Sequence, residues 1–221
     1  MTGIFVTLEG ADGSGKTTQW QLVQDYLQAK KIPNICIREP GSTLLGESLR
    51  TIIKDPGVIM DPITEAYVYA ACRAQLVAQV IKPALDEGKI VVCDRFLDSS
   101  IVYQGGARKL GIVAIQEINK HAVFGLEPNI TFFIDVPVDV SMHRASTRAG
   151  TCTDTKEKDR IDMEGVDFHS AVYEGYKKLA SRHKRIITID GMQSIESINT
   201  QIVNTIEKEL QKLRLGKVPL N

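Results

Sequence analysis

The stretch IFVTLEGADGSGKT, residues 4–17, decides how this chain folds. Its first six residues form a short run rich in β-branched and apolar side chains, which is typical of a buried parallel strand. Residues 10–17 then match the pattern GxxxxGK(S/T), and a helical pattern follows. Glycines let successive backbone N–H groups turn inward around an anion, and the next helix aims its dipole at the same point. The stretch therefore predicts a phosphate-binding loop between a strand and a helix.

Two side chains of this loop have expected roles toward a nucleoside triphosphate. Lys16 would reach the β- and γ-phosphates, and the Thr17 hydroxyl would ligate Mg²⁺. The predicted ATP-binding set is Gly10, Ala11, Asp12, Gly13, Ser14, Gly15, Lys16, Thr17 and Thr18. A GTPase switch is disfavoured, because the residues after Asp94 do not read DxxG and the pair Asn119-Lys120 is not followed by the Asp of NKxD.

Four further runs repeat the strand pattern. They span residues 35–38, 90–94, 130–135 and 186–190 and alternate with stretches of helical spacing, among them 64–87 and 195–213. Strands alternating with helices predict a three-layer α/β domain, with a five-stranded parallel sheet and helices on both faces. In such sheets ligands bind at the carboxyl ends of the strands. We expect one P-loop domain over residues 1–213 and a tail over residues 214–221.

The composition is that of an ordinary globular protein. The chain has 221 residues, with 27 Lys and Arg against 27 Asp and Glu. This balance argues against a general nucleic-acid or acidic-membrane binder, because such proteins usually carry an excess of basic residues. The four cysteines, Cys36, Cys72, Cys93 and Cys152, lack CxxC spacing and are expected to be free thiols. No signal-like segment and no apolar run of ~20 residues is present, so a cytoplasmic location is expected.

Charged clusters follow two of the other predicted strands. Residues 38–41 (REPG) come after the second strand, and residues 94–96 (DRF) come after the third. An arginine fork grips phosphate bidentately, so two arginines on the same rim as the phosphate loop favour a second phosphorylated ligand. Asp94 closes an apolar strand as a Walker-B-type carboxylate would, and is expected to hold Mg²⁺ through water or to orient Arg95.

Together these motifs resemble the bacterial thymidylate kinase family. The matching stretches are the phosphate loop with Asp12, REPG at residues 38–41, YAACR at 69–73, DRFLDSSIVYQGGAR at 94–108 and DRID at 159–162. They follow in consistent order from residue 4 to about residue 190. The resemblance implies the nucleoside-monophosphate-kinase version of the P-loop fold with a mobile lid, and a homodimer. It also implies the reaction of MgATP with dTMP to give ADP and dTDP, a step of dTTP biosynthesis.

The resemblance further implies which residues bind the phosphate and sugar of dTMP. Asp12 would accept a hydrogen bond from the 3′-hydroxyl and help to orient the acceptor. Arg38 and Arg95 would hold the phosphate, with Arg50 close by as a further positive charge.

A second group of residues is implied for the base. Tyr69 stands where the family usually has a Phe that stacks on thymine. Arg73 and Gln104 would read the base edge by hydrogen bonds. Ser99 and Tyr103 would line the base and sugar pocket, with Tyr103 crowding the 2′ position against ribose.

Phosphoryl transfer needs in-line placement and neutralisation of spreading charge. Some kinases of this family have an Arg where this chain has Gly13, and the others supply that charge from a lid. The basic segment 144–160 has no apolar periodicity and is expected to be such a lid, a loop that closes over ATP. The predicted catalytic set is Lys16, Arg95, Arg148, Arg160, Asp12 and Asp94. Asp167 is a further candidate for contact with the metal.

Two stretches depart from the family pattern. Ser42 replaces the usual second Gly after REPG, and residues 151–155 lengthen the lid. Two alternatives stay open: a kinase for another nucleoside monophosphate or a deoxynucleoside, and an ATP- or GTP-binding regulatory module without transfer activity. The motif at residues 94–108 argues against the second, because a pure switch needs no pocket for a second substrate.

Overall fold

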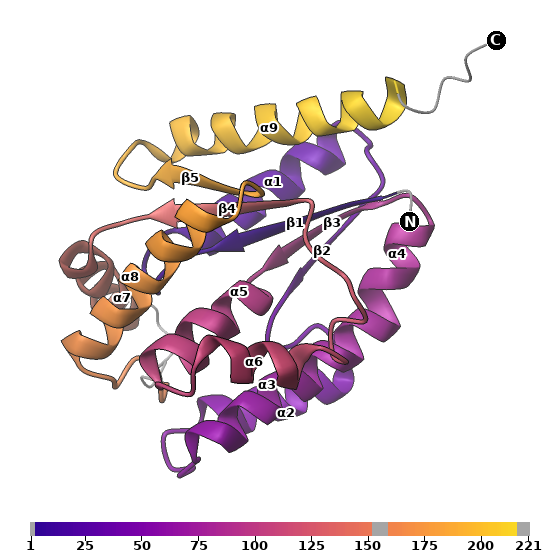
Figure 1. The fold of residues 1–221 in the computed structure, drawn as a ribbon. Coiled ribbons are helices and arrows are strands. Elements are labelled where there is room, and N and C mark those ends of the chain that lie inside the picture. Colours follow the sequence, from indigo (N-terminus) through magenta and orange to yellow (C-terminus); the bar gives the residue numbers. More distant parts are fainter. Residues whose placement is uncertain (1–2, 152–158, 216–221) are drawn as a thin grey trace.

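One sheet of five parallel strands organises the chain (Figure 1), in the order β2-β3-β1-β4-β5. The computed structural model describes the backbone of residues 3–151 and 159–215, and the side chains of these residues except 148–151 and 214–215. The strands are β1 (Ile4–Glu9), β2 (Asn34–Arg38), β3 (Ile90–Asp94), β4 (Ile130–Asp135) and β5 (Ile186–Asp190). The predicted fold class is confirmed, and the strands match their expected ranges apart from one residue added at Asn34.

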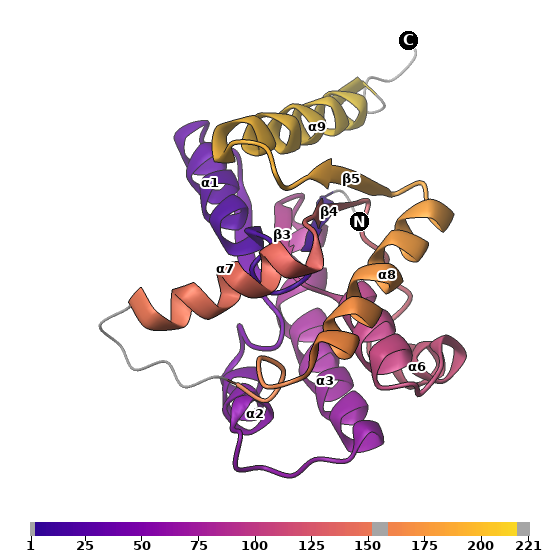
Figure 2. The ribbon, with the colours of Figure 1, turned by 90° about the vertical axis from the view of Figure 1, so that its left-hand side faces the viewer.

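Helices α1 (Lys16–Ala29) and α9 (Ile195–Leu215) cover one face of the sheet. Figure 2 shows both helices on the same side of the strands. Val23 of α1, Phe132 of β4 and Ile202 of α9 are fully buried in the core between them. The helical spacing predicted over residues 195–213 is confirmed. The apolar residues that recur on the face of α9 toward the sheet are Ile198, Ile202, Ile206, Leu210 and Leu213.

The opposite face is covered by helices from the middle of the chain, with α3 and α6 beneath the strands in Figure 2. These elements are α3 (Pro62–Leu76), η1 (Val77–Ile81), α4 (Lys82–Asp86), α5 (Leu97–Ser100), η2 (Ile101–Ala107), α6 (Ile112–Asn119) and α8 (Val166–Arg182). Helix α2 (Leu44–Lys54) packs on α3. Aromatic pairs join this layer to the sheet: Phe5 meets Phe96 edge-on at 4.9 Å, and Phe133 stacks on Tyr176 at 5.3 Å.

The helix predicted over residues 64–87 is confirmed in extent, although its middle segment η1 is π-helical. Asp61 caps its start, because the Asp61 side chain accepts a hydrogen bond from the Ile63 N–H at 2.9 Å. The backbone hydrogen-bonding pattern changes from π-helical to α-helical just before Pro83, which has no backbone N–H to donate. Gly88 follows the end with a φ of +79°, a conformation that glycine adopts without strain.

The loop expected over residues 144–160 is wrong in its first part, because α7 (Val138–Thr151) continues through it as a helix. Val140 in its first turn packs on the core. The sequence from residue 144 onward carries no apolar periodicity from which a helix could be predicted. Residues 152–158, with Cys152, and the end of the predicted tail lie outside the described residues, so the lid stays a prediction.

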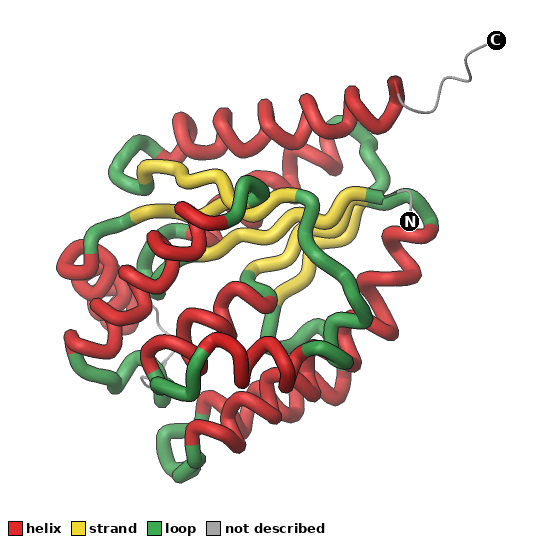
Figure 3. The backbone as a smooth tube through the Cα atoms, viewed as in Figure 1, coloured by secondary structure: helices red, strands yellow, loops and turns green. Residues whose placement is uncertain are grey.

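The carboxyl ends of all five strands lie at one edge of the sheet (Figure 3), because every neighbouring pair is parallel. The loops after β1, β2 and β3 therefore meet there, as expected for a ligand-binding edge. Within residues 3–151 and 159–215, no helix is long and apolar enough to cross a bilayer.

Candidate active site

The phosphate loop between β1 and α1 takes the conformation that its glycines permit. Gly10, Gly13 and Gly15 have φ values of +145°, +84° and +96°, which L side chains rarely adopt. The Lys16 ammonium lies back across the loop and donates to the Ala11 carbonyl oxygen at 2.7 Å. Burial and the positive charge of Arg95 lower the pKa of Lys16 to about 8. An anion bound in the loop would reverse that effect, because it would offset the like charges.

Position 13 requires glycine for a steric reason as well as for its backbone conformation. A Cβ at this position would lie 2.0 Å from the carbonyl oxygen of Ser141 in α7. An arginine at position 13 therefore cannot be accommodated while α7 stays in place. Any further positive charge for the transferred phosphoryl group has to come from another segment. The backbone of Arg148 belongs to α7, and its side chain lies outside the described side chains.

The side chains expected to hold Mg²⁺ lie together at the end of β3. The Thr17 hydroxyl donates to Asp94 Oδ2 at 3.0 Å. Asp94 Oδ1 is buried and has no hydrogen-bond partner among the described residues. Oxygen atoms of this kind, beside a phosphate loop, fit the oxygen-rich coordination that Mg²⁺ prefers. Asp167 does not join them, because it is exposed in the first turn of α8 and lines neither cavity described below.

A cavity of about 870 Å³, here called the larger cavity, opens beside the phosphate loop. Every residue predicted to bind dTMP lines it: Asp12, Arg38, Arg50, Tyr69, Arg73, Arg95, Ser99, Tyr103 and Gln104. They come from the loop after β1, from β2, α2 and α3, from the position just after β3, and from the α5–η2 segment. Lys16, Thr17 and Asp94 line the same cavity, so the structure brings the predicted phosphate and base residues together.

Arg95 is held in this cavity wall by several partners. Its Nη2 donates to Asp12 Oδ1 at 2.7 Å, and its guanidinium stacks over the Tyr103 ring at 5.1 Å. The Tyr103 hydroxyl donates to Asp12 Oδ2 at 3.1 Å. Burial opposes ionisation of Asp12, but the charges of Arg95 and Lys16 prevail and hold its pKa well below the usual range. Asp12 is therefore an ionised acceptor, with lone pairs left for a ligand hydroxyl.

Beneath Arg95 lies a polar cluster that the sequence interpretation missed. Arg95 Nη1 donates to Ser99 Oγ and to the Tyr176 hydroxyl oxygen, each at 3.2 Å. Both hydroxyls in turn donate to Glu9 Oε2, at 2.6 and 2.8 Å. The Phe96 N–H donates to the other carboxylate oxygen at 2.8 Å. Tyr176 comes from α8, far from the recognised motifs, so no local pattern could connect it with Arg95.

The REPG segment after β2 holds a second positively charged group. Arg38 Nη2 contacts both Glu47 oxygens at 3.2–3.3 Å, and Arg50 Nη1 donates to the Pro40 carbonyl oxygen at 2.7 Å. Burial and the charge of Arg38 lower the pKa of Arg50, so an anion between them would stabilise both. Ser42, which replaces the usual second Gly, has a φ of +62°, so it adopts a left-handed conformation that glycine takes more readily. Its hydroxyl accepts from the Arg38 N–H at 2.9 Å.

The contacts of Arg73 differ from those expected of a residue that reads the base edge. The side chain is fully buried, and its five N–H groups are all donated to protein acceptors. Glu39 takes two of them, in an ion pair at 2.6 Å. The other three acceptors are Ser100 Oγ, Asn119 Oδ1 and the Phe96 carbonyl oxygen. Base reading by Arg73 stays a prediction that this arrangement does not support, because one of these bonds would have to be exchanged.

Arg160 also lies away from its expected place. Its Nη2 forms an ion pair with Glu65 at 2.6 Å, and its Nε donates to the Ile53 carbonyl oxygen at 2.9 Å. Neither cavity is lined by Arg160, whereas its neighbours Asp159 and Ile161 line the larger one. The structure thus shows a guanidinium bound to α2 and α3, and its catalytic role stays a prediction.

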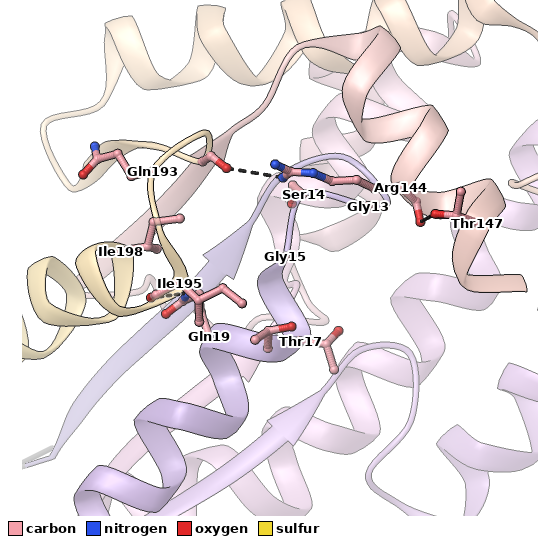
Figure 4. A pocket seen from close by; sticks show the side chains of 12 residues that line it. Gly13, Ser14, Gly15, Thr17, Gln19, Arg144, Thr147, Gln193, Ile195 and Ile198 are labelled. Carbon is pink, nitrogen blue, oxygen red and sulfur yellow. Dashed lines mark hydrogen bonds between the residues drawn. The ribbon is translucent and has the colours of Figure 1, made fainter. Parts of the chain in front are cut away.

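A smaller cavity of about 730 Å³ lies on the other side of the phosphate loop (Figure 4). Arg144 of α7 reaches across it and donates to the Gly191 carbonyl oxygen at 3.3 Å. Ile195 and Ile198 of α9 form an apolar wall, and Gln19 donates to the Ile195 carbonyl oxygen at 3.0 Å. Ile195 and Ile198 were not predicted to line a site, because they are distant from the phosphate loop in sequence and match no local motif. Arg144 stands at the start of the segment predicted to be the lid.

The phosphate loop forms the wall shared by the two cavities. Gly13, Gly15, Thr17 and Thr18 line both of them. Gly10 and Ala11, although part of the motif, line neither. A parallel sheet in the order 2-3-1-4-5, with a cavity on each side of such a loop, defines a kinase of the P-loop class.

Comparison with known proteins identifies the family within that class. The sequence model of the thymidylate kinase family matches residues 8–202. A thymidylate kinase of Thermoanaerobacter sp. is 43% identical over 95% of this chain and 100% of its own length. Thymidylate kinases of Kosmotoga olearia and Bacillus licheniformis are 42% and 40% identical over 96% and 97% of this chain, and over 100% of their own lengths. The chain belongs to the thymidylate kinase family.

Proposed function

We propose that the chain transfers the γ-phosphoryl group of ATP to dTMP, which yields ADP and the dTDP needed for dTTP synthesis. The observation that carries this proposal is that all the predicted dTMP residues line one cavity, while the phosphate loop separates it from a second. Two nucleotides bound on either side of one loop would direct their phosphates at each other. Membership of the thymidylate kinase family supports the same reaction.

ATP would bind with its base in the smaller cavity. Ile195 and Ile198 offer apolar contact to an adenine ring, and the planar guanidinium of Arg144 is suited to stack on it. The triphosphate would then follow the N–H groups of the phosphate loop to Lys16. This places the γ-phosphate at the border of the larger cavity, because Gly13, Gly15 and Thr17 line both cavities.

In the larger cavity, Arg38, Arg50 and Arg95 would hold the dTMP phosphate. Asp12 would accept the sugar hydroxyl, and Tyr103 would fill the space beside it. An oxygen of the dTMP phosphate attacks the γ-phosphorus, the bond to the β,γ-bridging oxygen breaks, and ADP leaves. Arg95 orients the attacking phosphate, since Asp12 and the hydroxyls of Ser99 and Tyr176 fix its guanidinium. Lys16 and the loop N–H groups stabilise the charge that develops on the transferred oxygens.

Mg²⁺ would be held by the Thr17 hydroxyl and, through water, by Asp94, whose buried Oδ1 has no partner among the described residues. When bound, the ion would neutralise part of the negative charge of the ATP phosphates. We keep Arg148 as the proposed lid charge, because Gly13 cannot be replaced by a side chain that would supply it.

The test is a coupled ADP-release assay across dTMP, dUMP, dCMP, dGMP and UMP. The proposal expects the highest kcat/KM with dTMP and strict dependence on Mg²⁺. Little preference for dTMP would favour another nucleoside monophosphate kinase. Binding of ATP without formation of dTDP would favour the regulatory module.

The homodimer implied by the family resemblance and the cytoplasmic location expected from the sequence are also proposals. Exposed apolar side chains on neighbouring helices support the dimer, among them Ile52 of α2, Tyr67 of α3 and Val113 of α6, which are 46%, 59% and 72% exposed. Light scattering coupled to size exclusion would measure the mass in solution. A monomer at micromolar concentration would contradict the first proposal, and recovery in the membrane fraction would contradict the second.

A further inference from the structure

Glu65 is a buried carboxylate with an unusual set of partners. It lies in the first turn of α3 and is 0% exposed. Its Oε2 accepts from Arg160 Nη2 at 2.6 Å and from Arg108 Nη2 at 3.3 Å. Its Oε1 accepts from Gln104 Nε2 at 2.9 Å and from Arg108 Nε at 3.3 Å. Four N–H donors therefore converge on one carboxylate, which matches its full acceptor capacity.

The two arginines determine what Glu65 offers to Gln104. Glu65 forms ion pairs with both guanidinium groups, and its two oxygens accept from all four donors. An ionised carboxylate can only accept hydrogen bonds. Gln104 must therefore turn its NH₂ group toward Glu65, because its carbonyl oxygen in the same place would face negative charge.

This orientation fixes the polarity that Gln104 presents to the larger cavity. Gln104 lines that cavity, and its NH₂ group is committed to Glu65. Its carbonyl oxygen has no hydrogen-bond partner among the described residues, so it is the free end of the amide. A carbonyl oxygen accepts hydrogen bonds only. Thymine and uracil carry a hydrogen on N3, whereas N3 of cytosine is itself an acceptor.

We propose that Glu65 is a positioning residue that selects the acceptor base by holding the Gln104 carbonyl oxygen toward N3 of the pyrimidine. The inference rests on the proposed function, since it assumes that the larger cavity binds the acceptor nucleotide. Thymine donates its N3–H to the Gln104 carbonyl oxygen. Cytosine would instead place the lone pair of its N3 against the lone pairs of that oxygen. A site built to pair a polar group rejects an analogue that leaves the group unpaired.

The first test uses the unaltered protein and a change in the substrate. Fluorine at C5 makes the N3–H of uracil more acidic, so 5-fluoro-dUMP loses this proton at a lower pH than dTMP. The ratio of kcat/KM for 5-fluoro-dUMP to that for dTMP should fall as the pH rises through the ionisation of N3. Because both substrates meet the same protein groups, the ratio cancels the enzyme's own titration. A ratio that stays constant or rises over that range would overturn the proposal.

The second test replaces Glu65 and keeps its shape. In Glu65→Gln, the carbonyl oxygen of the new side chain stays at Arg160, so its NH₂ group faces Gln104. The Gln104 amide then rotates, which directs its NH₂ group instead of its carbonyl oxygen into the larger cavity. The kcat/KM preference for dTMP over dCMP should fall by at least ~10-fold, which corresponds to about 1.4 kcal/mol. The preference for dTMP over dUMP should stay within about 2-fold, because these substrates differ only in the methyl group at C5.

Glu164→Gln is the matched control. Glu164 pairs with the same Arg108 at 2.5 Å but has no contact with Gln104 among the described residues. This variant should keep both preferences. An unchanged dTMP-to-dCMP ratio in an active Glu65→Gln variant would overturn the proposal. If that variant fails to fold, the 5-fluoro-dUMP profile decides. Absence of dTMP phosphorylation by the unaltered protein would instead refute the proposed function.

Discussion

Glu9, at the carboxyl end of β1, carries the most direct prediction about stability. Its side chain is fully buried under Arg95. Burial, with a contribution from the negative charge of Asp98, raises the pKa of Glu9 from 4.5 to about 7. The prediction concerns Glu9→Gln, which cannot ionise. The glutamine would keep an oxygen for the Phe96 N–H and direct its NH₂ group at the hydroxyls of Ser99 and Tyr176.

The magnitude follows from the pKa. Because the folded state binds the Glu9 proton more tightly than the unfolded chain, the associated stability is fully present below about pH 4.5 and is lost as pH rises through about 7. Each pKa unit corresponds to about 1.36 kcal/mol. The rise from 4.5 to about 7 therefore costs the wild type about 3 kcal/mol of unfolding free energy by pH 8.5. The Glu9→Gln variant avoids this cost.

The assay is urea unfolding followed by circular dichroism between pH 5 and pH 8.5. The difference in unfolding free energy, variant minus wild type, should increase by about 2–3 kcal/mol over this range, because a small part of the loss already occurs below pH 5. Glu174→Gln on the exposed side of α8 removes the same charge and should show a difference nearly independent of pH. If the difference for Glu9→Gln is also independent of pH, the reasoning about its buried carboxyl group is refuted.

Three further substitutions test the site. Arg95→Ala should lower kcat by ~10²-fold or more while the affinity for ATP, measured with a fluorescent analogue, hardly changes; an equal loss of ATP affinity would assign Arg95 to the donor. Arg148→Ala should lower kcat by ~10²-fold if it supplies the lid charge, and near-normal turnover in the same assay would move that role elsewhere. Arg73→Met should lower the unfolding free energy by about 3–5 kcal/mol, because Glu39 would be left buried and unpaired; a loss below about 1 kcal/mol in urea unfolding would contradict this.

The elements of this protein could be predicted because their signals are local. A buried strand is a short apolar run, and a core-facing helix repeats its apolar residues every three or four positions. The expectation failed at residues 144–151, where α7 continues as a helix although the sequence has no apolar periodicity there. The convergence of Asp12, Arg38 and Arg95 could also be predicted, since residues that end adjacent parallel strands emerge at one edge of the sheet.

The partners of the buried charges could not be predicted in this way. Arg73 matched a family motif, but only the packed structure shows Glu39 and Asn119 taking its donors. Arg160 matched another motif, yet Glu65, 95 positions earlier, binds its guanidinium. Hydrogen bonds between side chains so far apart leave no periodic trace in a single sequence.

The sequence by itself determined the five strands, the phosphate loop and the predicted residues that line the larger cavity. These follow from short-range patterns, from the geometry common to parallel sheets and from motifs shared with a family. Only the tertiary structure decided which of those side chains remain available to a ligand. It placed Glu9 beneath Arg95, Glu65 behind Gln104 and Arg144 across the smaller cavity. The physical reason is that a buried charge or amide takes its orientation from its nearest partners, and folding alone brings those partners together.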